Sequence, residues 1–351
     1  MGEIMYATRE DVRHAVDEAG ASRDAVEIDR ALAAATGKIN GALKRDFAPW
    51  TGTKYFDWPN LDTTVFRLYL DCDAQLIRLD SLTSGGVSID VAQVNLEPNI
   101  DGPPYNIVEI NRDTIGSYTQ GRTFQRSIAA TGLWGFDLNE RPAGALSGAL
   151  ASNTAQFTLP VGAGVGVGSI LRVDSERIIV TDLSSVDTGQ VCQSALADDD
   201  ADRLMTVADP TQFVTREVLS MGAEQCEVLD ILGTTLVLRR AVSGSLLTTH
   251  AGDAIYAQRL ASIDRGQLGT TAAAHSGAAA LNRHLFPALI RQYAVAEALI
   301  ELSLQASSYA RTRPAVGGIG GRGVPIAETG PADIRAEAMS AYGRYGRARA
   351  I

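Results

Sequence analysis

Residues 45–60, RDFAPWTGTKYFDWPN, constrain the fold more than any other stretch, because they end a helical pattern and begin a region of strands. Upstream, apolar residues recur at steps of four, three, four and four from Ile28 to Leu43, which predicts one face of a helix that ends near Arg45. Downstream of Thr64, short runs rich in Val, Ile, Leu and Thr alternate with glycine-containing breaks and predict strands. The junction itself contains no catalytic motif.

Aromatic side chains are concentrated at this junction. Aromatic residues in such density also occur on surfaces that stack the bases of single-stranded nucleic acid, where they lie in a positively charged groove. Only Lys44, Arg45 and Lys54 accompany them here, so packing against the end of the helical core is the favoured interpretation. The predicted structural junction consists of Phe47, Trp50, Tyr55, Phe56 and Trp58.

A second long helix is predicted near the other end of the chain, from Pro287 to about Tyr309. The apolar face of this helix and that of the N-terminal helix must each be buried against another element. We therefore expect an α+β fold in which the N- and C-terminal helices pack as one helical core, with a large β-rich, barrel-like insertion between them. The predicted segments are the N-terminal helical segment 1–58, a β-rich region 59–150, an inserted β module 151–281, the long helix 282–312, and a Gly-rich hinge with docking helix and basic tail 313–351.

Charge is unevenly distributed along the chain. The net charge is −10, which disfavours tight, sequence-specific binding of duplex DNA. Residues 311–351, however, carry seven arginines against three acidic residues, so the last segment is basic and is predicted to be a docking arm. No window is apolar enough for a membrane span and no secretory signal is recognisable, so we expect the protein to be made in the cytoplasm without membrane association.

The three cysteines, Cys72, Cys192 and Cys226, are odd in number and widely spaced, which argues against a disulfide framework or a zinc site. Aspartates 198, 200 and 202 match the start of a calcium loop, but Arg203 stands where that loop needs glycine, so a solvated loop is favoured over adventitious calcium binding.

An internal repeat is present 25 residues apart. Arg240, Gly244, His250 and Gly252 recur as Arg265, Gly269, His275 and Gly277. The favoured interpretation is a shared turn, in which the glycines supply positive φ angles and the histidines bond loop backbone.

The sequence contains no convincing catalytic motif. The pattern GxGxxG at residues 318–323 lacks the strand and helix that a dinucleotide site requires, so a flexible hinge is favoured. The four histidines form no zinc-protease motif, and neither a nucleophile elbow nor a phosphate-binding loop occurs. We therefore predict no enzymatic activity, no cofactor and no metal, although residues distant in sequence can still form a catalytic triad.

The string Arg45-Asp-Phe-x-Pro-x-Thr-Gly-Thr-x-Tyr-Phe-Asp57 after such a helix resembles the opening of head-to-tail adaptor (head-tail connector) proteins of long-tailed bacteriophages. Residues 103–111, residues 130–136 and the helix that ends Ser308-Tyr-Ala-Arg311 reinforce the likeness, in the order expected. The resemblance covers roughly residues 5–150 and 282–312. Residues 173–181 and 236–256 also look like a small β module of phage virion proteins.

The resemblance implies a virion protein of the neck that forms a homo-oligomeric ring, usually a dodecamer, beneath the portal protein. A downstream neck or tail-completion protein binds its far side, and DNA passes through the bore without sequence-specific binding. We expect residues 331–351 to dock on the portal, through Ile334, Met339, Tyr342, Arg344, Arg347 and Arg349. The alternative is a neck, tail or baseplate decoration protein whose β insertion binds a glycan or a tail partner. A DNA-packaging enzyme is a third, less favoured hypothesis.

Overall fold

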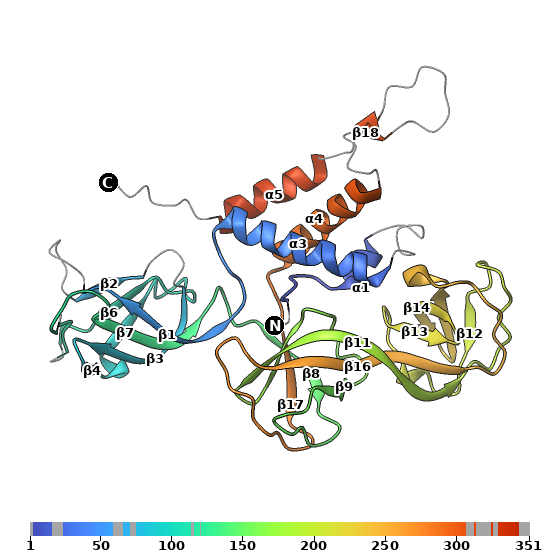
Figure 1. Cartoon of the computed structure of the whole chain (residues 1–351), viewed down its shortest axis with the longest axis horizontal. Helices are drawn as coiled ribbons and strands as arrows, with labels where there is room; N and C mark the ends of the chain where they lie inside the picture. Colours follow the sequence, from blue (N-terminus) through green and yellow to red (C-terminus); the bar gives the residue numbers. More distant parts are fainter. Residues whose placement is uncertain are drawn as a thin grey trace. The chain divides into compact units, whose positions relative to one another are not determined.

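The computed structural model describes residues 3–15, 24–58, 66–70, 75–113, 116–119, 121–306, 312–313, 324–325 and 329–343 (Figure 1). Strands make up 38% of these residues and helices 22%. The predicted fold class, a helical core with a β insertion and barrel-like module, is therefore wrong. Large antiparallel sheets dominate, no closed barrel is present among the described residues, and two hydrophobic clusters consist mainly of side chains from strands and their loops. Apolar helix faces predict that a helix is covered but not what covers it.

The chain divides into two compact units. Unit 1 contains residues 1–39, 140–267 and 271–340, and unit 2 contains residues 40–139, 268–270 and 341–351. The five segments predicted from the sequence divide the chain differently from these two units. That five-part division stays a prediction.

Unit 2 is built from two antiparallel sheets around one hydrophobic cluster. The strand order is β1-β7-β3-β4 in one sheet and β2-β6-β5 in the other. Side chains from both sheets, including Leu76, Leu82, Val108 and Trp134, are buried together. The strands are β1 (Trp50–Phe56), β2 (Arg67–Tyr69), β3 (Leu76–Ser84), β4 (Val87–Ile89), β5 (Val94–Glu97), β6 (Ile107–Ile110) and β7 (Ile128–Trp134), with a 3-10 turn η1 (Val91–Gln93).

Unit 1 contains a ten-stranded antiparallel sheet in the order β12-β15-β14-β13-β16-β11-β10-β17-β8, with β9 paired to β16. Its two longest strands, β11 (Glu176–Val191) and β16 (Ala254–Gln267), run side by side as a ribbon (Figure 1). The other strands are β8 (Glu140–Ala145), β9 (Gln156–Thr158), β10 (Ile170–Val173), β12 (Leu204–Thr206), β13 (Val218–Met221), β14 (Glu224–Leu232), β15 (Thr235–Arg239) and β17 (Ala280–His284), with 3-10 turns η2 (Pro210–Gln212) and η3 (Val242–Gly244).

The ribbon joins two copies of one β motif. We call residues 187–256 the distal module, and residues 140–186 together with 257–284 the proximal module. Hairpin β10–β11 of the proximal module corresponds to hairpin β13–β14 of the distal module, and a bulge follows at equivalent positions, between residues 180 and 182 in β11 and between 228 and 230 in β14. The edge pairs β9–β16 and β12–β15 also correspond. The distal module is thus a second copy inserted between β11 and β16 of the first.

Four α-helices and two short strands complete the described part of the chain. They are α1 (Arg9–His14), α3 (Ala25–Leu43), α4 (Ala288–Ala306), α5 (Thr329–Tyr342), β18 (Thr312–Arg313) and β19 (Val324–Pro325). Thr8 and Asp11 form the predicted capping box of α1. Within unit 1, ion pairs connect Arg9 of α1 with Asp29 of α3, and Lys38 of α3 with Glu301 of α4. None of the helices in the ranges given above is long and apolar enough to cross a membrane.

The aromatic residues of the junction have different surroundings. Phe56 is buried in the cluster of unit 2, and Trp50 and Trp58 pack against that cluster while remaining partly exposed. Phe47 is fully buried, and its ring contacts those of Phe136 and Tyr342. Tyr55 lies on the surface, with 63% of its area exposed. The role of the five residues as a structural junction stays a prediction, and Tyr55 lies outside the buried core.

Candidate functional site

The repeated residues of the sequence meet at a buried glutamate in the distal module. Glu224 follows the tight turn between β13 and β14, and its carboxylate accepts hydrogen bonds from Nε and Nη2 of Arg240 at 2.6 and 2.7 Å. The backbone N–H groups of Ala241 and Thr248 donate to the same carboxylate at 3.2 and 2.9 Å. Nε2 of His250 lies 3.0 Å from Oε2, and its Nδ1 lies 2.8 Å from a carboxylate oxygen of Asp253.

The proximal module contains the same arrangement around Glu176, which follows the turn between β10 and β11. Nε and Nη2 of Arg265 each donate to this carboxylate at 2.7 Å. The N–H groups of Gly266 and Ala273 donate at 2.8 and 3.0 Å. Nε2 of His275 lies 2.8 Å from Oε2. The second ring nitrogen, Nδ1, lies 2.7 Å from a carboxylate oxygen of Asp174.

Both central glutamates remain ionised in spite of their burial. The side chains of Glu176 and Glu224 have no exposed area. Burial by itself raises the pKa of each carboxyl group, but the hydrogen bonds from arginine, histidine and backbone N–H groups outweigh it and lower both pKa values to about 2. Each glutamate is therefore buried and charge-compensated, while the aspartate at the outer end of each network is exposed.

The prediction for the repeat is correct in part. Gly244, Gly252 and Gly269 have positive φ angles as predicted. At the fourth glycine, Gly277, it is the next residue, Ala278, that has the positive φ angle. The histidine rings, however, bond carboxylates instead of loop backbone, and it is the main chain of His250 that pairs with Leu196. Sequence reasoning missed the two glutamates.

A histidine between two carboxylates resembles a catalytic relay, but the glutamate and the histidine of each set are buried and bonded internally. Every carboxylate oxygen of Glu224 already accepts at least two hydrogen bonds, and only 3% of the His250 side chain is exposed. The glutamate, arginine and histidine occur twice in equivalent positions of one motif, whereas the outer aspartate comes from the loop after the histidine in one copy and from the hairpin turn in the other. The hydrogen bonds of each network connect the hairpin turn, the following strand and the loop, so the arrangement stabilises the motif.

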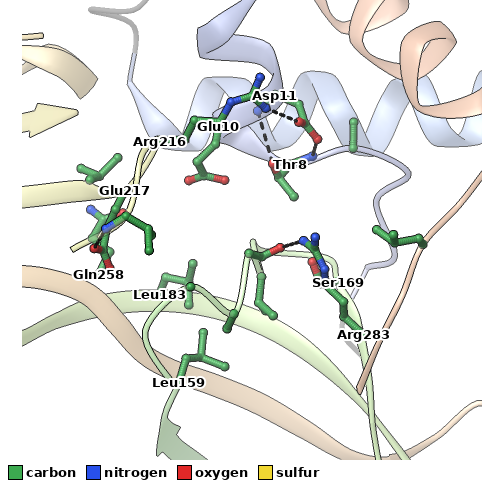
Figure 2. Close-up of a pocket in the computed structure, with 18 of the residues that line it drawn as sticks. Thr8, Glu10, Asp11, Leu159, Ser169, Leu183, Arg216, Glu217, Gln258 and Arg283 are labelled. Atoms are coloured by element: carbon green, nitrogen blue, oxygen red, sulfur yellow. Dashed lines mark hydrogen bonds and ion pairs between the residues drawn. The ribbon is translucent and has the colours of Figure 1, made fainter. Parts of the chain in front are cut away.

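A cavity of about 300 Å³ lies in unit 1 between the N-terminal segment, the loop after β9 and the segment that precedes α4 (Figure 2). Charged side chains line it, and several are paired with one another. Arg216 lies 3.6 Å from Asp11, and Arg259 donates to Glu217 at 2.6 Å. Figure 2 shows Glu10 and Arg283 on the same cavity. Burial lowers the pKa of Arg283, and the nearby charge of Arg291 lowers it further. The lining therefore combines both signs of charge and points to no single ligand class.

Of the residues predicted to dock on a portal, the structure describes Ile334, Met339 and Tyr342, and the docking itself stays a prediction. Ile334 of α5 lines a groove together with Val295 and Leu299 of α4. Tyr342 makes edge contacts with the rings of Phe47 and Phe136. Met339 is 36% exposed. Arg344, Arg347 and Arg349 lie outside the described residues, as does the glycine-rich segment 314–323.

The aspartate-rich loop has the geometry of an ordinary surface loop. Asp202 accepts a hydrogen bond from the N–H of Ala197 at 2.7 Å, and Asp200 pairs with Arg203. Among the residues that the structure describes, no group of three or more His, Cys, Asp or Glu side chains is arranged to hold a metal ion. Cys192 and Cys226 are buried free thiols.

Comparison of the chain with protein-family models, with curated proteins and with solved structures finds no match in any of the three.

Proposed function

We propose that this protein is a head-to-tail adaptor of a long-tailed bacteriophage, which forms a homo-oligomeric ring under the portal and joins the DNA-filled capsid to the tail. The observation that carries the proposal is the order of the motifs, from the string Arg45–Asp57 to the string Ser308-Tyr-Ala-Arg311. The acidic charge of the chain is consistent with a bore through which duplex DNA slides without sticking.

The buried networks support a structural role. The two sets of His, Arg and carboxylate side chains that most resemble catalytic groups are saturated with internal hydrogen bonds. Their duplication matches a function in holding a β motif together, since a catalytic site gains nothing from two closed copies.

Electron microscopy of the purified protein, alone and mixed with portal rings, tests the proposal. We expect ring-shaped particles that attach to one end of the portal. A truncation before Thr329 removes the proposed docking arm, with Ile334, Met339, Tyr342 and the three tail arginines, and should abolish attachment. A protein that stays monomeric and ignores portal would refute the adaptor function, while normal attachment of the truncated protein would refute the docking arm alone.

The decoration hypothesis is kept because the distal module exposes apolar side chains, among them Leu204, Leu232 and Leu246. The nested topology allows a clean deletion, because Val186 and Ala257 are direct partners in the β11–β16 ribbon. Replacing residues 187–256 by an Asn-Gly turn should leave the proximal module folded. The adaptor proposal expects ring formation and portal attachment to survive this deletion, whereas a decoration protein would lose its attachment to the virion.

A further inference from the structure

The two copies of the β motif differ on one face of the sheet. In the distal module, Leu204 of β12 lies opposite Val237 of β15, and Leu232 lies near the end of β14. Register places these three side chains on the same face, because directly paired residues and residues two apart point the same way. The other face carries Met205 and Leu236, which are buried in the core.

The proximal module provides an internal reference for this face. Pairing and bulge positions align Leu204 with Gln156, Val237 with Ser262, and Leu232 with Ser184. The amide of Gln156 donates to the hydroxyl of Ser262 at 3.0 Å. At one further aligned position on this face the difference is reversed, because the distal module has the polar Thr235 where the proximal module has the apolar Leu260. The motif therefore folds with polar residues at the three positions, so folding does not require the apolar ones.

The apolar side chains of the distal module lie on the surface. Leu204 is 57% exposed and Leu232 is 59% exposed. We call Leu204, Leu232 and Val237 the distal face. Exposing apolar area costs free energy, about 25 cal/mol for each Å² that remains in water. Apolar side chains gathered on one exposed face mark interaction sites, and the polar residues of the folded twin show that the fold does not require them there.

The surroundings of the distal face are acidic. Asp230 lies on the same face, opposite Val237, and Asp198, Asp199 and Asp200 precede β12 in an exposed loop. Residues 185–256 as a whole contain eleven acidic and four basic side chains. This charge disfavours a second distal face or nucleic acid as the occupant and favours a basic segment with apolar side chains.

The edge of the sheet beside this face is already closed. The carbonyl of Thr206 accepts from the N–H of Gln193, and the N–H of Thr206 donates to Oγ of Ser194 at 3.0 Å. The same hydroxyl donates to the carbonyl of Leu204 at 3.2 Å. An added strand would find no free ladder at β12, so an occupant packs on the face through its side chains.

We infer that the distal face binds the C-terminal segment, residues 344–351, of a neighbouring copy of the chain. This segment, RYGRARAI, contains three arginines, no acidic side chain and two large apolar residues, Tyr345 and Ile351. It lies outside the described residues and is the most basic stretch available to complement the acidic surroundings. The proposed portal contact uses the same arginines, so portal and distal face compete for the segment.

Fluorescence anisotropy with a labelled peptide of residues 342–351 tests the inference on protein truncated after Gly343. We expect saturable binding that weakens as salt is added. Substituting Leu204→Gln, Leu232→Ser and Val237→Ser introduces the residues of the proximal twin and should weaken binding at least about tenfold. A peptide with all three arginines replaced by glutamine should lose a similar factor. Circular dichroism and thermal melting check that the triple variant is folded.

Three outcomes would overturn the inference. The first is that the peptide shows no saturable binding, and the second is that the folded triple variant binds it with equal affinity. The third is that the truncated protein self-associates with rising concentration and the triple substitution abolishes this, because the occupant would then be a second distal face. Portal attachment is measured separately, so failure here leaves the adaptor proposal untouched. Contact with a neighbouring copy depends on concentration, so the distal face of the full-length protein should become free to bind the labelled peptide as the protein is diluted.

Discussion

Replacing Glu224 with glutamine should destabilise the distal module by about 3–5 kcal/mol at neutral pH. The substitution keeps the size of the side chain but removes the charge that faces Arg240, whose side chain has no exposed area. Breaking a buried ion pair on one side typically costs about 3–5 kcal/mol, because a charge stays buried without its partner. An independent figure comes from proton linkage. Lowering the pKa of Glu224 from its usual 4.5 to about 2 corresponds to roughly 3 kcal/mol, at about 1.4 kcal/mol for each pKa unit.

The pH dependence of this loss has a defined sign. The pKa of Glu224 is lower in the folded protein than in the unfolded chain, so the carboxylate contributes its full stability above about pH 5. That contribution falls as the pH drops from about 4.5 toward 2, because the unfolded chain takes up the proton first. A protonated glutamate resembles glutamine in shape and charge. The difference between Glu224→Gln and the unsubstituted protein should therefore shrink to below about 1 kcal/mol near pH 2.

Hydrogen exchange followed by mass spectrometry gives the local free energy of opening for residues 192–253, and urea unfolding gives the global value. Glu176→Gln is the matched substitution in the proximal module, and Asp230→Asn is the control for loss of an exposed charge, with an expected effect below about 0.5 kcal/mol. A loss below about 1 kcal/mol for Glu224→Gln at pH 7, or a loss of full size that persists at pH 2, would refute the electrostatic account of the network.

Two further predictions concern glycines outside the distal module and the two buried cysteines within it. Gly269 has a φ angle of +79°, and a Cβ there would overlap the carbonyl oxygen of Thr51, so Gly269→Ala should lower the free energy of unfolding by at least about 2 kcal/mol. Gly37→Ala, on the open side of α3, should raise the free energy of unfolding by up to about 1 kcal/mol. Equal effects of the two substitutions in urea titrations would contradict the overlap at Gly269 and the open space at Gly37. Cys192 and Cys226 are fully buried, and burial raises both thiol pKa values. Neither thiol should therefore react with a thiol reagent until urea unfolds the distal module, as measured by peptide mapping. Rapid labelling of either cysteine in native buffer would disprove their burial.

Local patterns were read correctly where a few neighbouring residues decide the structure. The Thr8 and Asp11 signature predicted the cap of α1, and the apolar spacing from Ile28 to Leu43 predicted α3. The turn glycines at 244, 252 and 269 took the positive φ angles that the repeat implied. Each of these features depends on contacts within one helical turn or one tight turn, so the sequence contains all that is needed.

The fold class was misjudged because apolar helix faces do not specify their partner. The ribbon of β11 and β16 connects residues 177 and 267, and the β17–β8 pair joins residues 140 and 284, so long-range antiparallel pairing organises unit 1. Alternation along each strand shows that one face is buried. The register of strands so far apart is set by the packing of the whole sheet.

The repeat separates most clearly what the sequence determined from what the tertiary structure decided. By itself the sequence determined that Arg240 and Arg265 begin equivalent turns, each followed ten residues later by a histidine. It could not assign their glutamates, because Arg240 lies 16 residues from Glu224 whereas Arg265 lies 89 residues from Glu176. The inserted distal module accounts for that difference. Only the folded chain brings both glutamates to the same place, because a buried arginine must pair with a carboxylate in space, whatever the distance along the chain.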